Sequence, residues 1–234
     1  MDSEKYEETI LMKACLEDQA DLVKQLLEEG ANTEVRGRGG RTALMYACAA
    51  GSMDSAVELI KHGANIHIRD GLQMNNTPLM YASQYSMFDL INLLLEKGAD
   101  LNDVNEDNQT ALFFAGMSED IAVFEYLVKK GADINARDEN GRTPHLFLSS
   151  LPGNRSFIEL LLDSGADINF KDYEGRTALQ IAVCADADAE TVEMLLKRGA
   201  DISIADDGGF TALDCAQERK NLPLIDLLMK YKSL

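Results

Sequence analysis

The sequence predicts an all-α solenoid, in which helix–turn–helix units stack side by side and projecting turns connect them. A phrase that begins with Thr, such as TALMYAC from Thr42 to Cys48, occurs seven times, with spacings of 33, 35, 33, 33, 34 and 34 residues. A second phrase, Gly-Ala-Asn or Gly-Ala-Asp, occurs six times in phase with the first. Repetition near this period indicates units that are too small to bury their own apolar faces and therefore stack on one another.

Each unit begins with a threonine that we expect to cap a short first helix, because a Thr hydroxyl can accept hydrogen bonds from the first free backbone N–H groups. Leu two positions later and Ala five positions later lie on one face of that helix in most units. The seven threonines are Thr9, Thr42, Thr77, Thr110, Thr143, Thr177 and Thr211.

A turn and a second helix follow in every unit. The segments DLVKQLLEEG and FDLINLLLEKG carry apolar residues at helical spacing, and their final glycine suits the left-handed residue that ends a helix. Next comes a polar stretch such as DINARDENGR, whose Asp-x-x-Gly pattern is typical of a tight turn. We call each of these projecting turns a finger.

The two ends of the array differ from its middle. Four residues after the threonine the inner units carry aromatic or aliphatic residues, whereas the first unit carries Lys13. A polar residue suits a helix with no neighbour on its outer side. The last unit closes with PLIDLLMKYKSL, whose lysines complement a helix C-terminus. We therefore expect the first and last units to act as caps.

Three units break the regular spacing. The finger between Gly63 and Thr77 is two residues longer than the others and places Leu72 and Met74 at its tip. These two side chains are candidates for contact with a partner, and the alternative for Leu72 is that it folds back on a neighbouring turn. In the sixth unit the extra residue suggests a longer loop within CADADAE. In the fifth unit either His145 is inserted into the first helix, or Leu148 occupies a place that is Ala elsewhere and risks overpacking.

These phrases resemble those of the ankyrin-repeat family, whose unit carries the pattern T-P-L-H-x-A. The resemblance covers about residues 5–230 and implies one domain over residues 1–234, with repeats that start near residues 5, 38, 71, 106, 139, 173 and 207. In the family the histidine of the pattern bonds neighbouring turns, and we expect apolar contacts in its place here. Its position is occupied by Met12, Met45, Met80, Phe113, Leu146, Gln180 and Asp214.

Composition excludes several partners. The net charge of −18 argues against nucleic acid and against an anionic membrane surface, and no run approaches the roughly 18 apolar residues of a membrane span. The acidic start MDSEKYEE is unlike a signal peptide. We expect a cytoplasmic protein, or a periplasmic or secreted one if a leader has been removed before Met1.

The cysteines and histidines do not form a recognisable site. Cys15, Cys48, Cys184 and Cys215 lack the spacing of a zinc site, and we expect all four to be reduced. Cys15 and Cys48 hold equivalent places in helices that we expect to stand about 8–10 Å apart, too far for a disulfide. No nucleophile is placed near a histidine, so we expect no enzyme, no cofactor and no metal.

The family resemblance implies a binding module that grips another protein with its fingers and with the exposed side of its first helices. We expect Arg38, Arg41 and Tyr85 among these residues to face solvent. The candidate residues are Arg36, Arg38, Arg41, Met45, Tyr46, Gln73, Met74, Asn76, Tyr81, Gln84, Tyr85, Asp107, Phe113, Met117, Arg137, Asn140, Arg142, Tyr173, Arg176 and Phe210.

Seven of the ten arginines lie in the fingers, which predicts a protein partner with an acidic patch. Arg41, Arg142 and Arg176 could instead be structural, because the family resemblance implies that Arg directly before the threonine is common. A dedicated regulator or inhibitor is the favoured interpretation, and an adaptor that localises its partner is the alternative. We expect a monomer when the protein is free, since both ends look capped.

Overall fold

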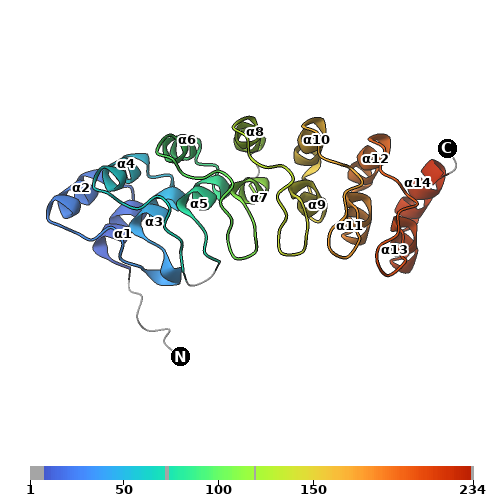
Figure 1. Ribbon diagram of the computed structural model, residues 1–234, viewed down its shortest axis with the longest axis horizontal. Coiled ribbons are helices and arrows are strands. Elements are labelled where there is room, and N and C mark those ends of the chain that lie inside the picture. The colour runs from blue at the N-terminus through green and yellow to red at the C-terminus, as the bar shows by residue number, and fades with distance from the viewer. Residues whose placement is uncertain (1–7, 72–73, 119, 233–234) are drawn as a thin grey trace, which may run out of the picture. The chain divides into compact units, whose positions relative to one another are not determined.

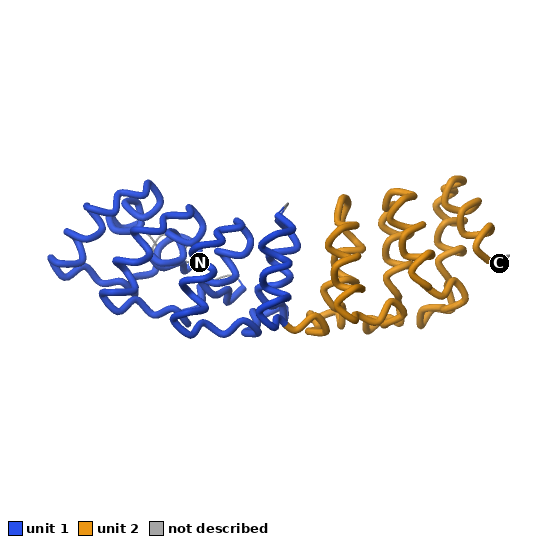
Figure 2. The backbone as a smooth tube through the Cα atoms, turned by 90° about the horizontal axis from the view of Figure 1, so that it is seen from above, with its two compact units in different colours: residues 1–132 blue, residues 133–234 orange. Residues whose placement is uncertain are grey.

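The computed structural model describes residues 8–71, 74–118 and 120–232. Within these ranges it contains fourteen α-helices, one 3₁₀ helix and no strand, apart from an isolated bridge between Ala205 and Thr211. The predicted all-α solenoid of helix pairs is therefore confirmed. The chain divides into two compact units, residues 1–132 and residues 133–234, which Figure 2 shows in different colours.

Unit 1, residues 1–132, has two layers of helices (Figure 1). Its first helices are α1 (Ile10–Leu16), α3 (Ala43–Ala50), α5 (Pro78–Gln84) and α7 (Ala111–Gly116), and each packs on the next in chain order. Its second helices are α2 (Ala20–Glu28), α4 (Met53–Lys61), α6 (Phe88–Glu96) and α8 (Ile121–Lys129). The 3₁₀ helix η1 (Arg38–Gly40) lies in the finger before α3.

Unit 2, residues 133–234, repeats this arrangement. Its first helices are α9 (Pro144–Ser149), α11 (Ala178–Cys184) and α13 (Ala212–Glu218), and its second helices are α10 (Arg155–Asp163), α12 (Ala189–Lys197) and α14 (Leu222–Lys232). Helix α11 packs between α9 and α13, and α12 packs on α14. Helix α13 thus has a first helix beside it on one side only among the described residues.

The core of each unit lies between the two helix layers. Leu44, Leu79 and Leu112 of the first helices are buried, and so are Leu59 and Leu94 of the second helices. A helix of six to nine residues is marginal alone in water, so this shared burial stabilises the helices.

The threonines stand at the N-cap of every first helix with extended backbone angles, but the predicted hydroxyl bond forms in only some of them, since Oγ1 of Thr42 and of Thr110 has no partner among the described residues. The hydroxyl oxygens of Thr9, Thr77 and Thr211 accept a hydrogen bond from the backbone N–H three residues later, at 3.2–3.3 Å. Such a cap contributes about 1 kcal/mol. The glycines that follow the second helices also behave as predicted, since Gly30 and its five equivalents have φ between 85° and 98°.

The family's inter-turn histidine has a polar substitute at one position, contrary to the expectation of apolar contacts throughout. The side-chain amide of Gln180 accepts from the N–H of Thr177 at 3.0 Å and donates to the carbonyl of Phe210 at 2.7 Å. Gln180 therefore links the start of α11 to the next finger. The residues at the equivalent places of α3, α5 and α7, namely Met45, Met80 and Phe113, are buried and apolar.

The extra residues of the fifth and sixth units both lie in the loop between the two helices. In the sixth unit this loop, residues 185–188, was predicted. In the fifth unit, the interpretation of His145 as an insertion is wrong, because α9 starts directly after Thr143 and its loop to α10 spans residues 150–154. His145 takes the place of the usual Leu, Leu148 takes the place of Ala, and both are 1% exposed.

Candidate functional site

The fingers of unit 2 are built around a buried carboxylate. Asp138 is 1% exposed, and its Oδ1 accepts from the backbone N–H groups of Asn140 and Arg142, each at 2.9 Å. Its Oδ2 accepts from Nε and Nη2 of the Arg142 guanidinium at 2.9 and 2.8 Å. Asp172 and Arg176 repeat the arrangement in the next finger. A buried charge is stable here because both of its oxygens are paired.

Consecutive fingers are joined by backbone hydrogen bonds within each unit. In unit 1 the N–H of Glu106 donates to the carbonyl of Met74 at 2.8 Å. In unit 2 the N–H of Tyr173 donates to the carbonyl of Asn140 at 3.0 Å, and Asp207 bonds Glu174 in the same way at 3.0 Å. The finger tips of a unit therefore form a connected row.

Tyr173 is the most exposed aromatic residue of this row. Its side chain is 63% exposed, and its ring lies 4.6 Å from the Arg137 guanidinium carbon. The same guanidinium lies 4.9 Å from the Phe170 ring and donates to the carbonyls of Gly141 and Lys171, both at 3.2 Å. Arg137 makes no ion pair with a carboxylate of the described residues. The structure thus brings together an oriented aromatic ring and an uncompensated positive charge.

Gly141 explains how the ring of Tyr173 comes so close to the preceding finger. A Cβ atom at Gly141 would stand 2.6 Å from two ring carbons of Tyr173, and the glycine has φ of 75°. Only glycine allows both this contact and this backbone angle at little cost.

In unit 1 the corresponding polar cluster is buried rather than exposed. The hydroxyl of Tyr81 donates to Asp70 Oδ2 at 2.8 Å and accepts from Arg41 Nε at 3.0 Å, and the Arg41 guanidinium stacks 4.8 Å from the Tyr81 ring. Burial, followed by the bond to Asp70, raises the pKa of Tyr81 to about 12. This cluster joins one finger to the next first helix and has a structural role.

Four of the predicted contact residues are buried, which corrects the expectation that they line an exposed face. Met45, Tyr46, Tyr81 and Phe113 are 0%, 7%, 3% and 1% exposed. The reason is that the third and fourth residues after each threonine face the neighbouring first helices, which cover them. The hydroxyl of Tyr46 also donates a hydrogen bond to Glu8 Oε1 at 3.1 Å. These side chains are not accessible to a partner in this structure.

The other predicted residues are more accessible, with one exception. Asn76 is buried and bonds Asn105 through its amide oxygen at 2.9 Å. Gln73, with Leu72, lies outside the described residues. The partly exposed side chains are Arg36, Arg41, Met74, Gln84, Asp107, Arg142 and Arg176, and the exposed ones are Arg38, Tyr85, Met117, Arg137, Asn140, Tyr173 and Phe210.

Most finger arginines bond to the chain itself. Arg142 and Arg176 pair with buried aspartates, Arg69 pairs with Asp103, and Arg36 Nη1 donates to the carbonyls of Gly40 and Arg69 at 3.0 and 2.5 Å. These arginines therefore bind acceptor groups of their own finger or of the next finger. Arg38 and Arg137 remain exposed and form no ion pair with the described carboxylates.

At the other end of the first helices the sequence reasoning predicted Tyr85 and Met117 but missed Phe88 and Ile121. Tyr85 and Met117 cap the C-termini of α5 and α7, and they lie beside the exposed Phe88 and Ile121 at the starts of α6 and α8. The four side chains are between 36% and 45% exposed. The signal in the sequence was a large apolar residue eleven positions after the threonine, which the first, fifth and sixth units lack.

Replacing Arg41 by Glu is expected to destabilise unit 1, whereas replacing Arg38 by Glu is not. The Arg41 side chain stacks on Tyr81, so a carboxylate in its place would lose this contact and repel Asp70. The expected loss is about 1–2 kcal/mol in urea denaturation of the full chain. The exposed Arg38 serves as the matched control, and equal stability of both variants would contradict this role of Arg41.

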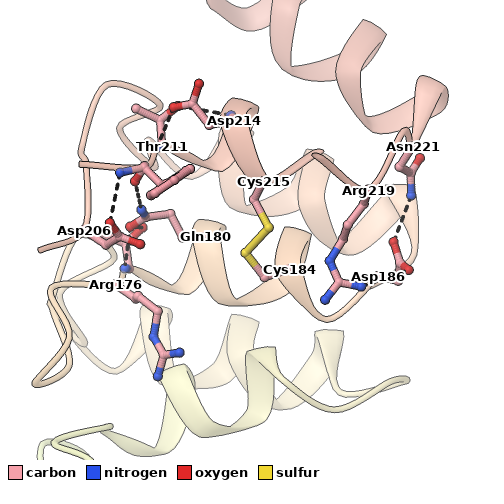
Figure 3. Close-up of a disulfide and its surroundings, with 12 residues drawn as sticks. Arg176, Gln180, Cys184, Asp186, Asp206, Thr211, Asp214, Cys215, Arg219 and Asn221 are labelled. Carbon is pink, nitrogen blue, oxygen red and sulfur yellow. Dashed lines mark hydrogen bonds and ion pairs between the residues drawn. A yellow bond between two sulfur atoms is a disulfide. The ribbon is translucent and has the colours of Figure 1, made fainter. Parts of the chain in front are cut away.

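The expectation that all four cysteines are free is wrong in unit 2. Cys184 and Cys215 form a disulfide with Cα atoms 5.8 Å apart (Figure 3). They occupy different places in their units, and residues on the facing sides of two stacked helices come closer than the helix axes do. Cys15 and Cys48 are free and buried, as predicted.

A typical metal site and a membrane-spanning helix each require a feature that is absent from the described residues. They contain no cluster of three or more His, Cys, Asp or Glu side chains that could hold a metal ion. Over the same ranges, no helix combines the length and the apolar character that crossing a membrane requires.

Comparison with known proteins defines the class. The family described as ankyrin repeats matches residues 1–70, 71–138 and 146–233, so the chain belongs to the ankyrin-repeat family. Ankyrin-repeat proteins are typically non-enzymatic modules that bind other proteins. No curated protein matches this chain. The number of seven repeats stays a prediction.

Proposed function

We propose that this protein binds and regulates a partner protein through its fingers, with Tyr173 of unit 2 as the main anchor. The observation that carries the proposal is the exposed Tyr173 ring, stacked on Arg137 and fixed through its backbone to Asn140. An aromatic side chain that is already oriented loses little conformational entropy on binding. Tyrosine and arginine are also enriched among residues that dominate binding energies.

The chemistry of the partner follows from the same group. The exposed Arg137 is held by two carbonyls and two rings and has its charge available, so the proposed partner presents an apolar pocket for Tyr173 and a carboxylate beside it. Arginine forms strong charge-assisted bonds with carboxylates. Phe210, 47% exposed on the finger that follows the finger of Tyr173, adds a second aromatic contact on unit 2.

Truncating Tyr173 to Ala is expected to speed dissociation of the partner roughly tenfold or more. The partner is first isolated from a native extract on the wild-type protein, and the rates are then measured by surface plasmon resonance. Leu222→Ala is the matched control, because Leu222 is 68% exposed on α14 and lies outside the fingers. Equal dissociation from wild type and from Tyr173→Ala would refute the finger assignment.

The activity of the isolated partner, measured with and without this protein, distinguishes a regulator from an adaptor. If the protein is an inhibitor or regulator, adding it at saturation changes the activity of the isolated partner. If it is an adaptor, the partner's activity is unchanged and only its position in the cell depends on the protein. We favour regulation, and the activity measurement decides between the two.

A further inference from the structure

The two cysteines of unit 2 join neighbouring first helices. Cys184 is the last residue of α11, Cys215 lies in α13, and 31 residues separate them in the chain. Both are partly exposed, so that a small thiol or disulfide in solution can reach the bond. Figure 3 shows the bond beside Asp186 and Arg219, at the end of the helices that lies away from the finger.

The two cysteines of unit 1 have the opposite character. Cys15 and Cys48 are each 0% exposed. Burial raises the pKa of Cys15 to about 12 and also raises the pKa of Cys48. Because the thiolate is the reactive form, these two thiols are inert in thiol–disulfide exchange. Oxidation is therefore selective for the pair in unit 2.

The bond holds a helix pair that, among the described residues, packs on one neighbouring pair only, α11 and α12. Near the disulfide, α13 and its turn are tied to the preceding pair by Arg219 and Asn221, which bond Asp186 at 3.4 and 3.1 Å and are exposed or partly exposed. At the finger end the links are the 2.7 Å bond from Gln180 to the Phe210 carbonyl, the 3.0 Å backbone bond from Asp207 to Glu174 and the 3.0 Å bond from Lys171 Nζ to the Ala205 carbonyl. A helix pair with one such interface in place of two opens more readily.

We propose that Cys184 and Cys215 are a reversible redox site, whose oxidation fastens α13 to α11 and so orders the last helix pair. The oxidant is a small-molecule disulfide such as oxidised glutathione. One cysteine thiolate attacks this disulfide, which forms a mixed disulfide and releases one glutathione thiolate. The second cysteine thiolate then attacks the protein sulfur of the mixed disulfide and releases the second glutathione. Two protein thiols are oxidised, and one glutathione disulfide is reduced to two thiols.

Closing the bond limits the freedom of the opened segment more than that of the packed one. Opening of α13 and α14 requires α13 to leave α11, and the cross-link keeps these two helices together. Constraining the opened state in this way shifts the local equilibrium toward the packed one. The inference goes beyond partner binding and does not rest on it.

Thiol counting tests the site itself. The full-length protein is equilibrated with oxidised or with reduced glutathione, unfolded in acid and alkylated, and the labelled cysteines are identified by mass spectrometry. We expect two free thiols, Cys15 and Cys48, in the oxidising buffer and four in the reducing one. Four free thiols in both buffers, or two in both, would overturn the proposal.

Hydrogen exchange tests the effect of the bond. Amides of α13 and α14 are expected to exchange roughly tenfold to a hundredfold faster in the reduced protein, while those of α3 and α5 are unchanged and serve as the internal control. Cys184→Ser and Cys215→Ser should each match the reduced wild type and no longer respond to glutathione. Equal exchange in oxidised and reduced wild type would show that the bond does not fasten the last pair.

Discussion

Replacing Asp138 by Ala is expected to lower the free energy of unfolding of the full chain by about 3–5 kcal/mol. The change removes four hydrogen bonds around a carboxylate that is 1% exposed. It leaves two backbone N–H groups and the Arg142 guanidinium without their partner. Urea denaturation followed by circular dichroism measures the loss, and hydrogen exchange of α9 and α11 shows whether it falls in unit 2.

The chain itself supplies graded controls for this prediction. Asn105 makes the same two backbone bonds as Asp138 but is followed by Gln109 instead of Arg, so Asp138→Asn should cost less than Asp138→Ala. Asp206 accepts from the N–H groups of Gly208 and Phe210 without an arginine, and Asp206→Ala should also cost less. A loss at Asp138 no larger than the loss at Asp206 would show that the Asp–Arg pair adds nothing.

The second large effect is a loss of stability on acidification that depends on His145. This side chain is 1% exposed, its Nδ1 bonds Thr143 Oγ1 at 2.8 Å, and its Nε2 has no partner among the described residues. Burial lowers the pKa of His145 from 6.5 to about 4, and the nearby Asp167 opposes this shift only in part. The imidazole is therefore neutral in the folded protein between these two pH values, whereas it is protonated in the unfolded chain.

The sign of the effect follows from proton binding. Between pH 6.5 and about 4 the unfolded state binds a proton that the folded state does not, so stability falls as the pH falls. The expected loss is about 1.4 kcal/mol at pH 5.5 and roughly 3 kcal/mol once the pH is below 4. Above pH 6.5 this residue contributes no pH dependence.

His145→Leu isolates this effect from that of the carboxylates. Leucine occupies the equivalent place in every other first helix, for example Leu112 and Leu179, so the variant should fold. Its stability should match or exceed that of wild type at pH 7.5, and the advantage should grow as the pH falls to 5.5. Parallel urea denaturation curves of the two proteins at all pH values would contradict the assignment.

Local chemistry explains why so much of the fold could be predicted. Thr42 and its equivalents, followed by apolar residues at helical spacing, define the first helices. Gly30 and its equivalents end the second helices because only glycine adopts their φ values without strain. Both signals lie within a few residues of the structure that they determine. The same holds for the Asx turn of each finger, where Asp138 bonds backbone groups two and four residues later.

The candidate site was predicted less well, because accessibility depends on residues about 33 positions away. Tyr81 was predicted to lie on an exposed face, but its side chain is buried and its hydroxyl forms hydrogen bonds with Asp70 and Arg41. Arg137 and Arg142 lie in the same finger, and the sequence does not distinguish their roles. In the structure Arg137 is exposed and stacked on the Tyr173 ring, whereas Arg142 is paired with Asp138.

By itself, the sequence determined the threonines that start the first helices, the glycines that follow the second helices and the repeat family, because these depend on local backbone preferences and on a period that stacking requires. Only the tertiary structure decided which side chains face solvent, which arginines keep a free charge, and that Cys184 meets Cys215. Those outcomes depend on which residues of neighbouring repeats come into contact. Contact between stacked helices follows the facing surfaces of the helices and not the equivalence of positions in the repeat.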